Sequence, residues 1–385
     1  MNLDFLKLLV EIDSNTQNIA GVNQVQKIVG SSLSSLGFDV KFLRNNQDKT
    51  GELLFAQRKG HSLKAITLVC HADTVIGPSE DFCFKLDLNS GRAFGPGIGD
   101  NKGAVAMALG SLKDFIEKND NHFYTINFVC SPSEETGSIG FHHIFKEIGE
   151  TSEIILGLEP ALTNGNIIDQ RSGNRWYKIN IKGVSGHAGR WNEKTINAAH
   201  LASELITTLV PLSNFDLKRR INVAKVHGGT DRYNVVCGEV ELRLDTRFKD
   251  FQSRDFIHHC ILEKLHSFQT LDDQISVEFD ITDDCPPLSL NKHSRELSDL
   301  ILKQIKIFEG KSFIAEYSGG AADINYFQNE KSISIDGLGP IAGKMHTKLE
   351  YIELESFYTR RHVLTSILNN LCKNQEGELY GNISI

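Results

Sequence analysis

Hydrophobic and polar positions alternate in two distinct rhythms along the first 130 residues. Apolar residues at 22–36 recur every three or four positions, which predicts an amphipathic helix, and residues 38–43 follow as an extended segment. The compact apolar runs at 65–70 and 124–130 predict buried strands, with a helix between them at 103–116. This alternation is typical of a parallel sheet with crossover helices.

The middle of the chain follows a different order. The pattern predicts strands at residues 176–182, 221–227, 239–248 and 275–281 and helices at 197–212 and 256–268. That order, β-α-β-β-α-β, is typical of a ferredoxin-like unit, which can fold as a compact insert. After Pro286 and Pro287 the α/β pattern resumes, with helices at 296–308 and 354–371 and a strand at 331–335. We therefore expect an α/β domain in two parts, residues 1–174 and 287–385, interrupted by a second domain at 175–286.

Length and composition fit two domains. The 385 residues exceed what one hydrophobic core usually organises, and 40% hydrophobic with 23% charged residues is typical of a globular protein. The formal net charge of -8 argues against nucleic acid as a partner. The 7 cysteines show no CxxC pair and no regular spacing, so we expect neither a disulfide framework nor a thiolate zinc site.

The N-terminal sequence argues against secretion. Acidic residues interrupt the apolar positions of the first eighteen residues, unlike the basic start and unbroken apolar run of a signal peptide. No stretch elsewhere is long and apolar enough to span a bilayer. We expect a cytoplasmic protein with no membrane partner.

Polar clusters follow the predicted strands of the first domain. His71 and Asp73 come directly after one strand, and two residues apart in an extended segment they point the same way, so the carboxylate can orient the imidazole. Glu134 and Glu135 follow the next strand, where their like charges repel unless a cation or a shared proton intervenes. Glu159 ends a third apolar run. Taken singly, each of these residues has a bland interpretation as a solvated side chain.

Two further residues extend this set. Asp100 lies in the glycine-rich segment 94–103, whose spacing matches neither a P-loop nor a dinucleotide fingerprint, and His346 follows the late strand. Carboxyl ends of parallel strands are where open α/β sheets bind ligands, so we expect these side chains to gather at one edge. Two histidines with at least three carboxylates suit zinc or another first-row divalent ion. If one carboxylate bridges, the set can hold two ions.

Five motifs carry a resemblance to a known family. They are HADTV at 71–75, GPGIGDNKG at 95–103, SEETGS at 133–138, LEPA at 158–161 and SGHAG at 185–189, followed by His346. With these motifs in family order, the chain resembles the M20 metallopeptidases, and most closely their bacterial glutamate carboxypeptidase branch. The resemblance implies a zinc-peptidase-like, three-layer α/β/α catalytic domain interrupted by a ferredoxin-like lid. It also implies a homodimer that forms through the lid.

The resemblance also assigns the metal ligands. It implies that one Zn2+ is bound by His71, Asp100 and Glu159, and a second Zn2+ by Asp100, Glu135 and His346. Asp100 would then bridge the two ions, and Co2+ or Mn2+ could substitute for zinc.

Further roles follow from the same resemblance. Glu134 would be the general base that takes a proton from water and gives it to the departing amine, and Asp73 would orient His71. His187 would reach the active site of the partner subunit and help to stabilise the oxyanion. The family also keeps a cis peptide bond after the bridging aspartate, here between Asp100 and Asn101.

Substrate recognition is matched only in part. Asn234 matches a lid asparagine that contacts substrate, and Arg247 matches a lid arginine suited to bind a carboxylate bidentately. The second arginine of the glutamate-releasing members aligns with Cys285, and the glycine-rich loop at 317–323 is altered. The resemblance therefore implies a free carboxylate on the substrate without specifying glutamate.

Three functions remain open from the sequence. The leading hypothesis is a di-zinc hydrolase that cleaves the amide bond of a small peptide or an N-acyl amino acid. A deacylase of the acetylornithine or succinyl-diaminopimelate type would share every metal residue and differ only in its pocket. A non-catalytic binding module is the alternative from another class, and it would be expected to lack a ligand or the base.

Overall fold

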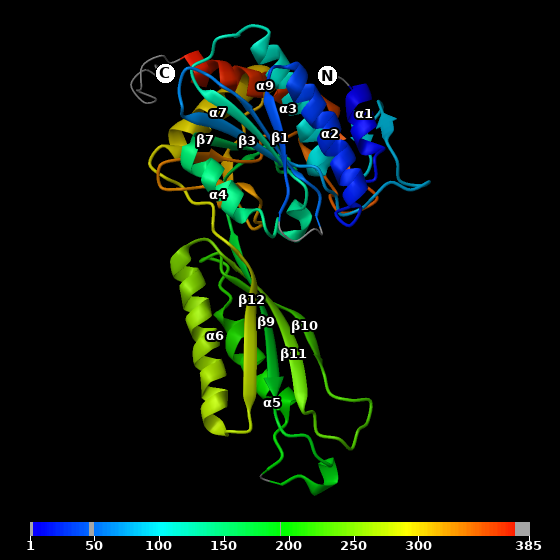
Figure 1. The fold of residues 1–385 in the computed structure, drawn as a ribbon, viewed down its shortest axis with the longest axis vertical. Helices are drawn as coiled ribbons and strands as arrows, with labels where there is room; N and C mark the ends of the chain where they lie inside the picture. Colours follow the sequence, from blue (N-terminus) through cyan, green and yellow to red (C-terminus); the bar gives the residue numbers. More distant parts are fainter. Residues whose placement is uncertain (1–2, 46–49, 193, 374–385) are drawn as a thin grey trace. The chain divides into compact units, whose positions relative to one another are not determined.

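The chain folds into two compact units (Figure 1). The computed structural model describes residues 3–45, 50–192 and 194–373. The first unit comprises residues 1–170, 290–317 and 322–385, and the second unit comprises residues 171–289 and 318–321. The expected boundaries, 174/175 and 286/287, lie within a few residues of this division.

A six-stranded sheet forms the centre of the first unit. Its order is β1-β2-β6-β3-β7-β14, and the bounds are β1 (Asp39–Leu43), β2 (Leu53–Arg58), β3 (Ala65–His71), β6 (Thr125–Ser131), β7 (Ser152–Gly157) and β14 (Ile333–Ile335). The pairs β3–β6, β3–β7 and β7–β14 are parallel. Strands β1 and β2 are antiparallel to their neighbours, so a wholly parallel arrangement is wrong for the start of the chain. The segment between β1 and β2 is too short for the crossover that parallel pairing requires.

Helices cover both faces of this sheet, which confirms the three-layer α/β/α architecture. One face packs against α2 (Ile19–Ser35), α3 (Gly103–Ile116), α7 (Ser294–Glu309) and α9 (Leu354–Lys373), and α1 (Leu3–Val10) packs on α3. The other face carries α4 (His142–Thr151) and α8 (Ile324–Phe327), which contact β7. Leu68 and Phe128 project from neighbouring strands into the core shared with the four-helix layer, and both are fully buried.

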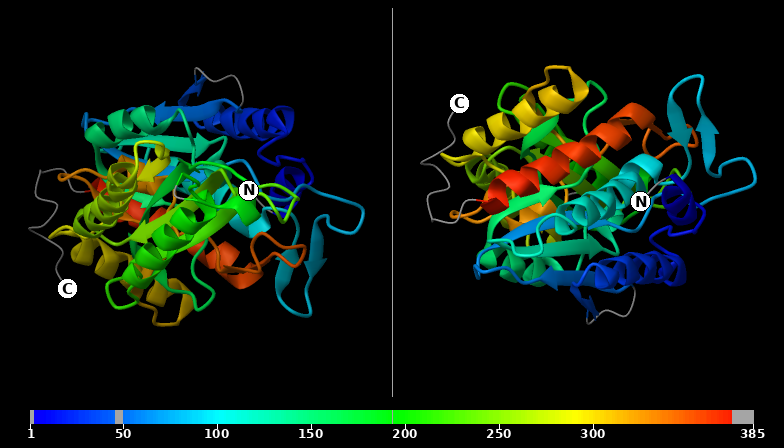
Figure 2. Two further views of the ribbon diagram at one scale, coloured as in Figure 1. Left: turned by 90° about the horizontal axis from the view of Figure 1, so that it is seen from below. Right: turned by 90° about the horizontal axis from the view of Figure 1, so that it is seen from above.

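A second, smaller sheet joins distant parts of the first unit. Its order is β15-β16-β5-β4, with β4 (Lys85–Asp87), β5 (Arg92–Phe94), β15 (Ala342–Gly343) and β16 (Tyr351–Glu353). Ala93 of β5 pairs with Ile352 of β16, so the glycine-rich segment after β5 lies beside the segment that carries His346. The β4–β5 hairpin projects at the edge of the first unit (Figure 2). A separate two-stranded sheet is formed by β8 (Ile167–Arg171) and β13 (Ala315–Ser318).

The second unit has the predicted ferredoxin-like order. Its antiparallel sheet runs β10-β11-β9-β12, with β9 (Gly173–Lys182), β10 (Arg220–Gly228), β11 (Glu239–Phe248) and β12 (Ser276–Cys285). Helices α5 (Ala198–Leu209) and α6 (Phe251–Leu271) pack against the sheet around a separate core that includes Leu244 and Ile257. Glu241 of β11 forms ion pairs with Lys178 of β9 and Lys225 of β10, so the unit also carries a charged surface.

Two further observations bear on the expectations from composition. All seven cysteines are free, and Cys70, Cys130, Cys285 and Cys372 are buried. Within the described ranges, no helix combines the length and the hydropathy needed to cross a membrane.

Candidate active site

Three neighbouring parallel strands of the first unit end beside one another, and polar side chains follow each of them. His71 is the last residue of β3. Glu134 and Glu135 begin the short 3-10 turn η2 (Glu134–Thr136) after β6, and Glu159 follows β7. The polar clusters therefore lie along one edge of the sheet, where open α/β folds place their ligands.

Asp100 reaches this edge on the turn η1 (Ile98–Lys102) that precedes α3. The preceding Gly97 has φ 64°, and a Cβ at this position would lie 2.1 Å from Thr74 Cγ2, so only glycine fits. The Asp100–Asn101 peptide bond is cis, which confirms the expectation drawn from the resemblance.

The two carboxylate oxygens of Asp100 face different histidines. Asp100 Oδ1 lies 2.8 Å from His71 Nε2, and Asp100 Oδ2 lies 3.3 Å from His346 Nε2. Glu159 Oε1 lies 3.6 Å from His71 Nε2, while Glu135 Oε2 lies 3.3 Å from His346 Nε2. Asp100 thus lies between the two histidines, with Glu159 beside one histidine and Glu135 beside the other. One ligand atom each from His71, Asp100 and Glu135 lies within 4.8 Å of the others, a spacing that could hold a metal ion.

The carboxylates of the cluster favour positive charge at its centre. Hydrogen bonds to Asp100 and then Glu135 raise the pKa of His346 to about 10. Burial alone would lower the pKa of His71, but its hydrogen bonds with Asp100 and Asp73 raise it well above the usual value. Burial would raise the pKa of Asp100, yet the two histidines hold that pKa below its usual range. A cation is therefore stabilised at this position.

The adjacent glutamates differ in their surroundings. Burial, and then the charge of Glu159, raises the pKa of Glu134 well above its usual value. Burial also raises the pKa of Glu135, although its hydrogen bond with His346 opposes this shift. Across the described ranges, Glu135 Oε1 is one of the buried side-chain oxygens with no hydrogen-bond partner. A buried carboxylate oxygen without a partner fits a metal ligand.

Asp73 connects both glutamates to His71. The Nδ1 atom of His71 lies 3.0 Å from the main-chain oxygen of Asp73 and 3.4 Å from its Oδ1. Oδ1 also accepts the main-chain N–H of Glu134 at 3.0 Å, and Oδ2 accepts that of Glu135 at 3.3 Å. Thr16 adds a hydroxyl donor to Oδ2 at 2.7 Å. A fully buried carboxylate thus orients the imidazole and caps the turn that carries both glutamates.

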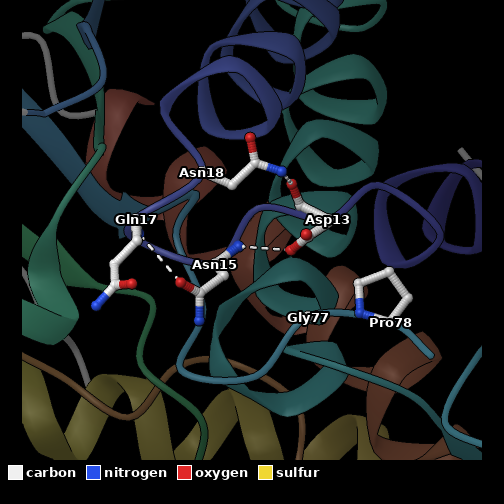
Figure 3. Close-up of a pocket in the computed structure, with 6 residues that line it drawn as sticks. All are labelled: Asp13, Asn15, Gln17, Asn18, Gly77 and Pro78. Carbon is white, nitrogen blue, oxygen red and sulfur yellow. Dashed lines mark hydrogen bonds between the residues drawn. The ribbon is translucent and has the colours of Figure 1, made fainter.

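Thr16 belongs to a loop with its own internal hydrogen bonds (Figure 3). The main-chain N–H of Asn15 donates to the Asp13 carboxylate, and that of Gln17 donates to Asn15 Oδ1, both at 3.1 Å. Thr16 N–H donates to the main-chain oxygen of Thr74 at 3.2 Å, which ties the loop to the segment after β3. The open hollow beside this loop has one charged lining residue, Asp13. The loop contributes to the cluster by supporting Asp73.

The remaining predicted residues lie in the second unit. His187 Nδ1 accepts the main-chain N–H of Gly189 at 3.0 Å, and the main-chain N–H of Ala188 donates to the oxygen of Asn234 at 2.9 Å. Arg247 is held by Asp245, whose two carboxylate oxygens lie 2.9–3.1 Å from the guanidinium nitrogens. The first unit forms its cluster without these residues, and their roles toward substrate stay predictions.

Sequence reasoning missed three polar residues of the first unit besides the ligands. Thr16 gives no local signal, because its partner Asp73 is 57 positions away. Asp323 is buried, burial raises its pKa to about 6, and its charge acts on Glu134. Its position at the end of the altered glycine-rich loop could have drawn attention to it. Glu350 is also buried and gives no local signal, because its partner Asp100 is 250 positions away.

The comparison with known families now decides the classification. The sequence model of Peptidase family M20/M25/M40 matches residues 67–370. The chain belongs to this family. As a member of a peptidase family whose relatives are hydrolases, it is a hydrolytic enzyme.

Individual relatives cover nearly the whole chain. Carboxypeptidase G2 of Pseudomonas sp. (strain RS-16) is 25% identical over 368 residues, which span 95% of this chain and 88% of that protein. Succinyl-diaminopimelate desuccinylase of Buchnera aphidicola subsp. Acyrthosiphon pisum (strain Tuc7) is 26% identical over 385 residues, 96% of this chain and 98% of that one. Among solved structures, the fold matches the Bacillus subtilis YXEP protein, a dinuclear metal binding peptidase from the M20 family. The TM-score is 0.68 with 15% identity, and the match covers 96% of this chain and 97% of that one.

Proposed function

We propose that this M20 enzyme holds two divalent metal ions and hydrolyses the amide bond of a small peptide or N-acyl amino acid that keeps a free carboxylate. The position of Asp100 carries the proposal, because each of its carboxylate oxygens faces a different histidine and a different glutamate completes each donor set. The description of the YXEP protein as dinuclear supports the same stoichiometry here.

The donor chemistry fits zinc. His71, Asp100 and Glu159 would hold one ion, and Asp100, Glu135 and His346 the other, so every ligand atom is an imidazole nitrogen or a carboxylate oxygen. The buried Oε1 of Glu135, which has no partner in the described part of the chain, is consistent with this role. When bound, such ions supply Lewis acidity toward a carbonyl oxygen and a water molecule.

Glu134 is the general base in this proposal. It belongs to neither donor set, yet its main-chain N–H is fixed by Asp73 beside the ligand Glu135. Burial and the charge of Glu159 raise its pKa, which moves its proton affinity toward the range where it can both accept and release a proton. Glu134 would take a proton from the attacking water and pass it to the departing amine.

The substrate's carboxylate is assigned to the second unit. Arg247 presents a planar guanidinium suited to bidentate carboxylate binding. Its Nε and Nη2 now donate to the two carboxylate oxygens of Asp245, which a substrate carboxylate would displace. Asn234 is proposed as a second substrate contact. We further propose a cytoplasmic homodimer that forms through the second unit. In that dimer, His187 would stabilise the oxyanion in the active site of the partner subunit.

A second candidate activity is supported by the desuccinylase relative, which this chain matches over 98% of that protein's length. A deacylase would use the same ligands and the same base on an N-acyl amino acid. No particular observation favours a non-catalytic binding module, since the base and five ligand positions are all present.

The test uses the purified chain loaded with Zn2+ or Co2+. Dipeptides, tripeptides, folyl-glutamates, N-acetylornithine and N-succinyl-diaminopimelate would show which bond is cleaved. Glu134→Ala should bind metal as the parent does but lose turnover by about 10²–10⁴-fold, the usual contribution of a general acid–base residue. Glu147→Ala, on the exposed side of α4, is the matched control and should keep full turnover. Unchanged turnover in Glu134→Ala would contradict the assignment of the base.

A further inference from the structure

Glu350 is a buried carboxylate that the metal cluster does not use as a ligand. Its side chain is 4% exposed, and its two oxygens accept three main-chain N–H groups from the glycine-rich segment before α3. The donors are Gly97 to Oε2 at 3.3 Å and, to Oε1, Gly99 at 2.8 Å and Asp100 at 3.0 Å. One carboxylate therefore accepts three main-chain N–H groups of the turn that presents Asp100.

Glu350 also belongs to the segment that carries His346. Both residues lie between β15 and β16, four positions apart, and the main-chain oxygen of Glu350 accepts the N–H of Gly95 at 3.3 Å. A Cβ at Gly99 would lie 2.7 Å from the Cβ of Ala342, so the two segments are in close contact here. Glu350 therefore links the segment that carries His346 to the turn that carries Asp100, the residue shared by both proposed donor sets.

A second buried polar side chain lies near the Glu350 carboxylate. Lys102 is buried close by, 1% exposed, and its Nζ donates to the main-chain oxygen of Ile12 at 2.9 Å. Lys102 and Glu350 interact electrostatically.

We propose that Glu350 is a positioning residue, which holds the Asp100 turn against the His346 segment so that Asp100 can serve both donor sets. It acts through main-chain N–H groups of the turn and is assigned to neither donor set. The inference rests on the proposed function, because it requires a metal centre that shares Asp100. A merely structural cap would lower the stability of the fold and leave the metal affinity of the folded protein unchanged.

The experiment compares Glu350→Gln with Glu353→Gln in the full chain. Glu353 lies three positions later, at the end of β16, and pairs with Arg92 outside the cluster, so it is the carboxylate-to-amide control. The metal-free proteins would be titrated with Co2+, followed by calorimetry and by visible absorption, which reports the geometry around the ion. Loss of an outer partner of a metal ligand typically costs 10–100-fold in affinity, so we expect about that loss and an altered spectrum for Glu350→Gln only.

The outcomes separate this inference from the proposal on which it rests. A Glu350→Gln protein with the parent's affinity and spectrum would overturn the positioning role. A parent chain that binds no Co2+ would refute the metal centre itself, and the inference with it. If Glu350→Gln does not fold, amide hydrogen exchange on the metal-free parent decides: slow exchange at residues 97–100 is expected, and fast exchange there would overturn the role.

Discussion

Substitution of Asp73 tests most directly whether one carboxylate holds several residues of the site in place. The Asp73 carboxylate accepts the main-chain N–H groups of Glu134 and Glu135 and the hydroxyl of Thr16, and it lies beside His71. Asp73→Asn keeps the shape of the side chain, removes its charge and replaces one accepting oxygen with an NH2 group. The variant therefore disturbs the proposed base, two proposed metal ligands and the N-terminal loop together.

The expected magnitude follows from the contacts. Hydrogen bonds to charged groups contribute about 1.5–3 kcal/mol each, and asparagine keeps one accepting oxygen, so one or two such bonds are lost. We expect the free energy of unfolding to fall by about 1.5–6 kcal/mol. Because His71 also loses its oriented partner, we expect metal affinity to fall by about 10–100-fold.

Two measurements check this expectation. Urea unfolding of the metal-free protein reports the stability, and competition with a chromophoric chelator reports the affinity for Zn2+. Asp299→Asn, on the exposed side of α7, is the same substitution at a position without these contacts and should match the parent. If Asp73→Asn unfolded and bound Zn2+ as the parent does, the central place given to this carboxylate would be wrong.

Two other predictions concern the fold. Leu68→Ala removes a fully buried side chain from β3, so urea unfolding should show a loss of about 2–5 kcal/mol, and a loss below about 1 kcal/mol would contradict the packing described for this core. In the second unit, Lys225 and Arg243 lower the pKa of Glu241 from 4.5 to about 2, so its stabilising contribution is complete above pH 4.5 and is lost as the pH falls toward 2. Glu241→Gln should therefore lose less stability than the parent between pH 4.5 and 2, and parallel pH profiles would refute the ion-pair assignment.

Much of the architecture could be predicted because its signals are local. Helix α3 occupies the predicted residues 103–116, since its apolar positions recur at helical spacing and buried positions cover nearly its whole length. The order of elements in the second unit follows from the same periodicities. Strand β1 was predicted as the extended segment 38–43, whereas β2 and its antiparallel pairing with β1 were missed, although Leu53 and Leu54 at the start of β2 are buried.

The site was predictable at the ends of strands and much less so between them. His71, Glu134 and Glu159 follow apolar runs that mark buried strands, so the sequence shows where they gather. The supports of the site join residues far apart: Thr16 meets Asp73 across 57 positions, and Glu350 meets Asp100 across 250. No local pattern encodes such pairs, because they depend on how the loops pack in three dimensions.

The central claim is that Asp100 is shared by two metal ions. Crystals of the Zn2+-loaded enzyme, measured with X-rays on both sides of the zinc absorption edge, test it directly. The account predicts two anomalous peaks per chain, one beside His71 and Glu159 and one beside His346 and Glu135, each in contact with an oxygen of Asp100. A single peak, or two peaks of which one leaves Asp100 unbound, would contradict it.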